Sequence, residues 1–251
     1  MEQIDTLKNG YKIIQDTERF QFGIDAVLLA DFAVSGGTQA SGDIKVIDLG
    51  TGTGIIPLLM AGKLINSQHR EKKSSVSFTG LEVQEASAQM AARSVAMNGL
   101  EKLITITHGD LKNISSLFER HSFNVVTCNP PYMIDTHGRC NELDAKTIAR
   151  HEVLCTLEDV VAAADYLLAP HGRFFMIHRP FRLPEIFESL DAHKLEPKRM
   201  RLIYPFANKE PNMVMIEARK NAKRRLTIEP PLVVRNDDGE YTDEIHRIYG
   251  D

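Results

Sequence analysis

Tryptophan, long apolar runs and paired cysteines are absent from this sequence of 251 residues. Because no stretch of about 18 uncharged apolar residues occurs, we expect no membrane-spanning helix. The first residues have no basic segment followed by an apolar one, so we also expect no secretory signal. The three cysteines lack a C-x-x-C spacing, which predicts neither a disulfide framework nor a metal site. They suit a reducing compartment, and we expect the protein to be cytoplasmic.

The composition is that of a globular protein, with 43% hydrophobic and 25% charged residues, which excludes a disordered or collagen-like chain. A net charge of −4 argues against a general nucleic-acid coat protein, but this charge is unevenly distributed. The segment from Lys194 to Arg225 contains ten Lys and Arg residues against three Glu, a local charge of +7. Such a patch is typical of a surface that binds a polyanion. The alternative is a solvated surface that happens to be basic.

Strand-like and helix-like segments alternate along the chain, which predicts βαβ units and a mostly parallel sheet with helices on both faces. The expected strands are Val46–Leu49, Val76–Glu82, Ile104–His108, Asn124–Cys128 and Arg173–His178. The expected helices between them are Ile55–Ile65, Gln84–Asn98, Ile114–Arg120 and Leu157–Leu168. Two later strands, Arg201–Tyr204 and Asn212–Arg219, are so close in sequence that they can pair only antiparallel.

We expect a single domain with a short N-terminal cap. The cap, residues 1–43, contains an amphipathic strand at Lys8–Gln15 and an apolar helix at Phe22–Phe32. Residues 44–225 form the core. Residues 226–251 are a C-terminal extension whose role the sequence does not indicate.

A glycine-rich loop follows the first core strand, where Val46–Gly54 reads VIDLGTGTG. Gly50, Gly52 and Gly54 allow a tight turn and let a ligand lie against the backbone. The G-x-G-x-G spacing differs from the G-x-G-x-x-G of dinucleotide sites, and the G-K-[ST] of a P-loop is missing. Asp48 would repel a pyrophosphate, so it suits a cationic or hydroxyl-bearing ligand.

Two further acidic residues stand at the ends of the next two strands. Glu82 could accept hydrogen bonds from both hydroxyls of a ribose, and Asp110 could accept one from the exocyclic amine of adenine. With Asp48 they fit a ligand that has amino-acid, ribose and adenine parts but no phosphate, as S-adenosylmethionine does. Each acid alone could equally be a helix cap or a solvated turn residue. The 34 positions from Asp48 to Glu82 exceed the usual interval of roughly 20, and a polar surface loop at residues 66–75 accounts for the difference.

The fourth strand ends in Asn129-Pro130-Pro131-Tyr132. Here the sequence resembles the class I S-adenosylmethionine-dependent methyltransferases with an N-P-P-Y signature, which methylate nitrogens conjugated to a π system. The resemblance implies a Rossmann-like α/β fold whose mostly parallel, seven-stranded sheet has an antiparallel edge strand. It also implies S-adenosylmethionine as the cofactor, bound by the three acids, the three loop glycines and Asn129.

The chemistry of such a nitrogen explains the residues of the signature. Its lone pair is delocalised into the π system, so it is a poor nucleophile. The side-chain carbonyl of Asn129 and the main-chain carbonyl of Pro130 would accept its two hydrogens and favour a pyramidal nitrogen. Pro131 stiffens the loop, and Tyr132 offers a face on which a planar base can stack. Arg150 and His151 are left out of the catalytic set, because the product amine can lose its proton to water.

Other segments make the resemblance narrower. The stretches 22–30 (FGIDAVLLA), 148–152 (IARHE) and 217–220 (EARK) are similar to the bacterial tRNA1(Val) adenine-37 N6-methyltransferase family, over about Leu7 to Lys220. This similarity implies tRNA as the partner and places Gly23 and Asp25 at the cofactor end of the pocket. Lys223, Arg224 and Arg225, at the end of the basic segment, are then expected to contact the tRNA backbone on a surface continuous with the site.

Several other functions share part of this pattern. Protein glutamine-N5 methyltransferases have N-P-P-Y but generally carry a helical substrate domain before the glycine loop, for which 43 residues are too few. Ribosomal-RNA guanine-N2 enzymes usually have Phe in place of Tyr132 and a duplicated domain. A DNA adenine methyltransferase would need a target-recognition domain. A non-catalytic cofactor- or RNA-binding module is the alternative outside enzymes, and the intact set of acids with N-P-P-Y argues against it.

Overall fold

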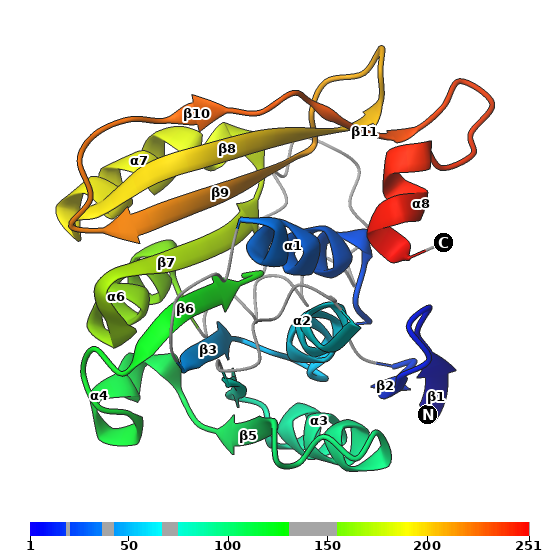
Figure 1. The fold of residues 1–251 in the computed structure, drawn as a ribbon, viewed down its shortest axis with the longest axis vertical. Helices are drawn as coiled ribbons and strands as arrows, with labels where there is room; N and C mark the ends of the chain where they lie inside the picture. The colour runs from blue at the N-terminus through cyan, green and yellow to red at the C-terminus, as the bar shows by residue number, and fades with distance from the viewer. Residues whose placement is uncertain (19–20, 37–42, 67–74, 131–154, 251) are drawn as a thin grey trace.

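The computed structural model describes residues 1–18, 21–36, 43–66, 75–130 and 155–250, which form a central sheet flanked by helices (Figure 1). Five parallel strands run through it in the order β7-β6-β3-β4-β5. They are β3 (Ile44–Leu49), β4 (Val76–Glu82), β5 (Ile104–His108), β6 (Phe123–Cys128) and β7 (Leu168–His178). The order reverses between β3 and β6, and the carboxyl ends of strands at such a point are where ligands bind in open α/β sheets.

An antiparallel hairpin continues the sheet beyond β7. The strand β9 (Met213–Lys220) pairs with β7 and with β8 (Leu195–Phe206), antiparallel in both cases. Two short strands, β10 (Thr227–Ile228) and β11 (Leu232–Arg235), then pair parallel with β8. All seven strands predicted for the core are therefore present. The sheet has nine strands rather than seven because the C-terminal segment covers the edge of β8, and the antiparallel strand β9 lies inside the sheet rather than at its edge.

Helices cover both faces of the sheet and enclose two hydrophobic clusters. Alternate residues of β3 point to opposite faces, so Val46 belongs to one cluster and Ile47 to the other. The first face carries α1 (Ile24–Ser35), α2 (Ile55–Asn66) and α3 (Glu85–Met97). The second carries α4 (Ile114–Leu117), α6 (Leu157–Leu167) and α7 (Leu183–Ala192). Because both faces are buried, the central strands are apolar almost throughout, and this is why the sequence predicts them well.

The N-terminal segment corrects one prediction. The single strand expected at Lys8–Gln15 is a hairpin of β1 (Glu2–Thr6) and β2 (Lys12–Asp16). Gly10 makes the turn with φ +84°, a conformation that favours glycine. The hairpin lies against α3 (Figure 1), where the backbone N–H of Ile14 donates to Ser94 Oγ at 2.9 Å.

The helices differ from prediction in two places. The helix predicted at Ile114–Arg120 is a 3₁₀ turn, η1 (Leu111–Asn113), followed by α4, which already ends at Leu117. The helix α7 was not predicted, and it is preceded by a second 3₁₀ turn, η2 (Pro180–Arg182). In the described residues, no helix is long and apolar enough to cross a membrane.

The C-terminal extension is part of the core. Leu232, Ile245 and Ile248 are buried in the same hydrophobic cluster as α1 and α2. Figure 1 shows the last helix, α8 (Asp243–Tyr249), beside α1. Lys63 on α2 donates to the carbonyl of Ile248 at 2.6 Å and pairs with Asp31 on α1 at 2.8 Å. Residues 226–250 therefore close the first face of the sheet.

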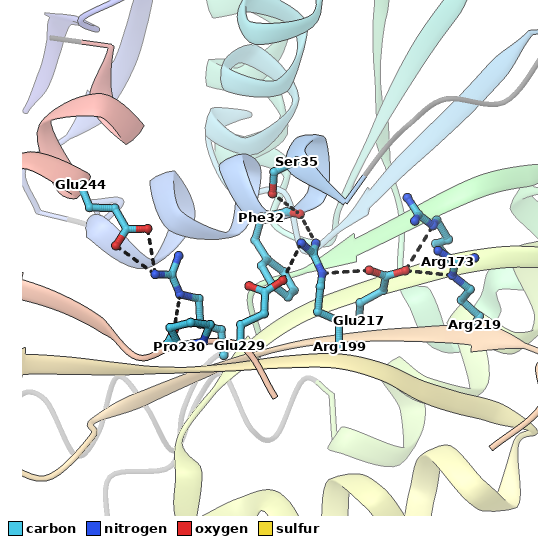
Figure 2. A network of polar contacts seen from close by, with 10 residues as sticks. Phe32, Ser35, Arg173, Arg199, Glu217, Arg219, Glu229, Pro230 and Glu244 are labelled. Atoms are coloured by element: carbon cyan, nitrogen blue, oxygen red, sulfur yellow. Dashed lines mark hydrogen bonds and ion pairs between the residues drawn. The ribbon is translucent and has the colours of Figure 1, made fainter. Parts of the chain in front are cut away.

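One buried carboxylate joins three strands, a helix and the extension (Figure 2). Glu217 on β9 is 2% exposed and pairs with Arg219 at 2.9 Å, Arg199 at 3.1 Å and Arg173 at 3.2 Å. Arg199 also donates to the carbonyl of Phe32 in the last turn of α1 at 2.6 Å and pairs with Glu229 of the extension at 3.1 Å. The network ties α1 and the extension to the hairpin.

The same contacts change the interpretation of the basic segment. Arg201 pairs with Glu244 at 2.8 Å, and the nearly buried Lys220 pairs with Asp165 at 2.9 Å. Together with Arg199 and Arg219, they are neutralised by structural partners. Asp165, Glu229 and Glu244 lie outside the segment, so they counter three of its seven net positive charges, and this part of the charge holds the fold together.

Replacing Glu217 with Gln should remove the buried charge that three guanidinium groups share, although Arg199 would keep another acidic partner, Glu229. We expect the free energy of unfolding to fall by about 3–5 kcal/mol, the usual effect of breaking a buried ion pair. The matched control is Asp191→Asn, which breaks the exposed pair of Asp191 with Arg224 and should cost no more than about 1 kcal/mol. Urea denaturation of both variants measures the difference, and equal effects would contradict the role given to Glu217.

Candidate functional site

The predicted acids meet at the carboxyl ends of the central strands. Asp48 on β3 lies opposite Gly80 on β4 and Thr127 on β6. Asp48 and Glu82 are 1% and 5% exposed. The backbone N–H of Gly109 donates to the carbonyl of Glu82 at 2.9 Å, which joins the ends of β4 and β5. The parallel register thus brings together side chains that are far apart in the sequence.

The glycine loop presents open backbone next to these acids. Gly50 and Gly52 have φ values of +68° and +57°, and a Cβ on either residue would meet no atom within 4 Å. At Gly54 a Cβ would lie 3.2 Å from the Cβ of Ala91 on α3. The first two glycines therefore leave space in front of the loop, whereas the third allows the loop to pack closely against α3.

Glu82 holds the glycine loop in place. Its Oε2 accepts a hydrogen bond from the N–H of Gly52 at 2.9 Å, and its Oε1 accepts one from the N–H of Gln84 at 2.8 Å. Both carboxylate oxygens are thus engaged by the protein, which the sequence did not indicate. Each oxygen keeps a second lone pair, so the side chain can still accept hydrogen bonds from two hydroxyl groups of a ligand.

Asp48 is buried with incomplete partners. Its Oδ1 accepts a hydrogen bond from the Thr127 hydroxyl at 2.7 Å. Within the described residues, Asp48 Oδ2 and Thr51 Oγ1 are buried and make no hydrogen bond. Burial raises the pKa of Asp48 to about 7, the Glu82 charge adds to this, and the nearby Thr127 and Thr51 hydroxyls oppose it. Because buried polar atoms normally have partners, a cationic or hydrogen-bonding ligand group fits this position.

The third acid has a structural partner. Asp110 accepts a hydrogen bond from the N–H of Lys112 at 2.9 Å and caps η1. The helix-cap role that the sequence left open for this acid is therefore present. Its charge and that of Glu82 also act on the thiol of Cys155, just before α6. Burial is the largest influence on this thiol and raises its pKa to about 11. Cys155 therefore lies at the same edge as the acids.

The structure adds three residues that sequence reasoning did not assign to the site: Thr51, Thr127 and Cys155. Thr51 stands within the glycine loop, so its position was a signal that could have been used. Thr127 reaches Asp48 only through the register of β6 against β3. Cys155 reaches the edge only through the placement of α6.

Asn129 and Pro130 follow β6 beside the glycine loop. Cys128, the last residue of β6, is paired with Leu49, the residue before Gly50. Pro130 is buried, and Asn129 is partly exposed. Pro131, Tyr132, Arg150 and His151 lie outside the described residues, and the roles given to Pro131 and Tyr132 stay predictions.

Gly23 and Asp25 stand at the start of α1. Asp25 Oδ1 accepts a hydrogen bond from the N–H of Ala26 at 2.9 Å. Its charge also acts on the Tyr249 hydroxyl of α8, whose pKa burial raises to about 12. The start of α1 thus faces the C-terminal helix. The assignment of Gly23 and Asp25 to a cofactor stays a prediction.

The prediction that Lys223, Arg224 and Arg225 lie on a surface continuous with the site is wrong. Arg219, near the end of β9, pairs with Arg173 in the middle of β7, whereas Val214, near the start of β9, pairs with His178 at the carboxyl end of β7. Lys223, Arg224 and Arg225 follow β9, so they lie at the opposite edge of the sheet, at least about 17 Å from the site. The cause is the antiparallel direction of β9. Whether these exposed residues contact a substrate stays a prediction.

Metal ligands do not gather anywhere in the part of the chain that the structure describes: no three His, Cys, Asp or Glu side chains lie together as a metal site requires. The described residues at the strand ends are the acids, the glycine loop and Asn129-Pro130. Together they offer hydrogen-bond acceptors, one buried carboxylate in need of a donor, and open backbone.

Comparison with known proteins agrees with this arrangement. A family model described as a methyltransferase domain matches residues 40–222. A Porphyromonas gingivalis protein named tRNA1(Val) (adenine(37)-N6)-methyltransferase is 28% identical over 233 residues, which cover 90% of this chain and 86% of the relative.

Solved structures show the same fold. A predicted O-methyltransferase from Agrobacterium tumefaciens has a TM-score of 0.68 at 20% identity, covering 90% of this chain and 95% of that one. Geranyl diphosphate C-methyltransferase from Streptomyces coelicolor, solved with S-adenosyl-L-homocysteine, has a TM-score of 0.53 at 14% identity and covers 77% and 78% of the two chains. These matches confirm the predicted Rossmann-like fold class.

Asp48→Asn should change how stability depends on pH. The pKa of Asp48 rises from an ordinary value of 3.8 to about 7 in the folded chain, so the folded state binds this proton more tightly. The resulting stabilisation is fully present below about pH 4 and is lost as the pH rises to about 7. The wild-type free energy of unfolding, relative to Asp48→Asn, should fall by about 2–4 kcal/mol over that range.

Urea denaturation at several pH values measures this difference. The exposed Glu119→Gln serves as the control, because an exposed surface substitution should change the free energy of unfolding by no more than about 0.5 kcal/mol. A constant difference for Asp48→Asn would show that the buried carboxyl does not bind the additional proton.

Proposed function

This chain belongs to the methyltransferase family, and we propose that it transfers the methyl group of S-adenosylmethionine to N6 of an adenine in tRNA. The observation that carries the proposal is the placement of Asn129-Pro130 directly beside the glycine loop, through the pairing of Cys128 with Leu49. An acceptor for amine hydrogens would then lie next to a loop that binds the cofactor. The name of the Porphyromonas gingivalis relative supports position 37 of a valine tRNA as the target.

The residues at the strand ends fit S-adenosylmethionine. Its charged amino group would donate to Asp48 Oδ2, the buried oxygen that makes no hydrogen bond within the described residues. Its ribose hydroxyls would donate to the remaining lone pairs of Glu82, and its adenine amine to Asp110. The open backbone at Gly50 and Gly52 leaves the room that such a ligand needs. When bound, the cofactor's sulfonium supplies the methyl group and the leaving group.

The acceptor residues then act on the target amine. The carbonyl oxygens of Asn129 and Pro130 accept its two hydrogens and hold the nitrogen pyramidal, so its lone pair points at the methyl group. The methyl group that the cofactor would supply could then bond to this lone pair, and Asn129 and Pro130 would hold the two nitrogen-bound protons until one of them passes to water. No protein base is needed. Tyr132 would stack on the adenine.

The biological setting is part of the proposal. We assign the protein to the cytoplasm, where tRNA is available and thiols stay reduced; the described cysteines, Cys128 and Cys155, are unpaired. We retain residues 44–225 as the catalytic core and residues 1–43 as the cap. The extension, residues 226–251, contributes to the core of that unit through residues such as Leu232 and Ile248.

Labelled S-adenosylmethionine tests the proposal against its rivals. The purified protein is incubated with the labelled cofactor and, separately, with total tRNA, ribosomal RNA and a ribosomal release factor. We expect label only in tRNA, recovered as N6-methyladenosine after nuclease digestion. Label in the release factor or in guanine of ribosomal RNA would refute the assignment.

Asn129→Ala should lower turnover far more than cofactor affinity. The hydrogen bond from the amine strengthens as the nitrogen becomes pyramidal, so its loss should reduce kcat by about 100- to 1,000-fold. Steady-state kinetics with tRNA gives kcat, and calorimetry gives the Kd for S-adenosylmethionine. The exposed Asn113→Ala is the control and should match the wild type in both. A loss of cofactor affinity as large as the loss of kcat would mean that Asn129 acts mainly in cofactor binding.

Reversing the charges of Lys223, Arg224 and Arg225 tests the predicted contact with the tRNA backbone. Backbone contacts release counterions, so methylation at sub-saturating tRNA should fall steeply as salt rises. The triple variant should show a higher KM for tRNA and a flatter salt dependence, with unchanged affinity for S-adenosylmethionine. Normal methylation by this variant at every salt concentration would exclude a tRNA contact at Lys223, Arg224 and Arg225. The tRNA would then contact only the edge of the sheet that carries the site.

A further inference from the structure

Phe181 is exposed at the edge that carries the site. It lies in η2, between the end of β7 and the start of α7, and is 54% exposed. Within the described part of the chain, it is the one aromatic residue among the exposed large hydrophobic side chains. Its neighbours Leu183 and Phe187 pack against the second hydrophobic cluster, and Phe181 does not. Single exposed apolar residues are common, so the position of this ring is what matters.

The strand register places the segment that carries Phe181 next to the segment that carries Asn129. Cys128 on β6 is paired with Met176 on β7, so the residues that follow each strand leave the sheet side by side. The strand β7 ends at His178, two residues after Met176, and η2 begins at Pro180. Phe181 follows the last residue of β7 by three positions and Pro130 follows the last residue of β6 by two, so both residues leave the same edge of the sheet from neighbouring strands.

Basic residues stand close to Phe181 in the sequence and in the neighbouring connection between β8 and β9. Arg179 donates to the carbonyl of Asn212 at 2.9 Å, which fixes it against the connection between β8 and β9. Arg182 pairs with Glu185 at 2.6 Å. Burial, helped by these two guanidinium groups, lowers the pKa of His178 to about 4, so this imidazole is neutral near pH 7. The exposed Lys209 lies in the same connection, beside Glu210.

We propose that Phe181 is a stacking platform for a tRNA base that flanks the target adenine. This inference rests on the proposed function and deepens it by locating a substrate contact. Turning a base out of its stack costs a few kcal/mol, and an aromatic face next to the site replaces part of the lost stacking of the neighbouring base. Single-stranded RNA is commonly recognised by bases stacked on aromatic side chains. Arg179 and Lys209 supply charge that suits the adjacent phosphates.

The test measures tRNA binding without turnover. Equilibrium binding of unmodified tRNA is compared, in the presence of S-adenosylhomocysteine, for the wild type, Phe181→Ala and Phe181→Tyr. Removal of the ring should raise the Kd by about 5- to 100-fold, whereas Tyr keeps the ring and should stay within about 2-fold. Ile228→Ala is the matched control. Ile228 on β10 is 64% exposed and pairs with Met200 in the middle of β8, so it lies away from the strand ends. It should leave the Kd unchanged.

The outcomes separate this inference from the proposed function. Wild-type affinity in Phe181→Ala, or an equal loss in the Tyr and Ala variants, would overturn the platform. A release factor whose binding is weakened by Phe181→Ala, while tRNA binding is not, would overturn its assignment to RNA. If the wild type binds tRNA through the ring but does not methylate adenine, the platform stands and the proposed reaction fails. Thermal unfolding of each variant shows that the exposed substitution leaves the fold intact.

Discussion

The parallel register of β3 with its two neighbours is the constraint on which the rest of the structure depends. Both faces of β3 are buried, and the strand is held between β4 and β6. Its carboxyl end is therefore next to the ends of both neighbours, where the chain order reverses. The glycine loop, Glu82 and Asn129 all leave the sheet at this point, so the site follows from strand pairing more than from any contact within a loop.

The site uses an unfavourable arrangement within a stable frame. A carboxyl buried as deeply as Asp48 favours its protonated form, and one of its oxygens makes no hydrogen bond within the described residues. Such a group destabilises the ionised protein and is suited to a ligand that brings a donor. Glu82 does the opposite, because it fixes the loop backbone through Gly52 and Gln84 before any ligand arrives. Glu82 thus fixes the backbone of the glycine loop, and Asp48 offers a buried oxygen to a hydrogen-bond donor of the ligand.

The ion pairs around Glu217 show why charge counted along the sequence is a poor guide to surface charge. Glu217 is surrounded by three arginines, and Arg199 reaches from it to α1 and to Glu229 of the extension. These pairs hold the hairpin, α1 and residues 226–250 in one unit. The charge of the basic segment alone cannot show this, because three of its acidic partners, Glu229, Glu244 and Asp165, lie outside the segment.

The sequence by itself determined the features that depend on local pattern. These are the alternation of strands and helices, the bounds of strands such as Val76–Glu82, the glycine loop, and the acids at the strand ends. Tertiary structure decided the features that depend on pairing between distant segments. Thr127 meets Asp48, the extension adds β10 and β11, and the antiparallel direction of β9 carries Lys223 to Arg225 away from Asn129. The physical reason is that periodicity reports which face of an element is buried, whereas register and strand direction depend on partners that are remote in the sequence.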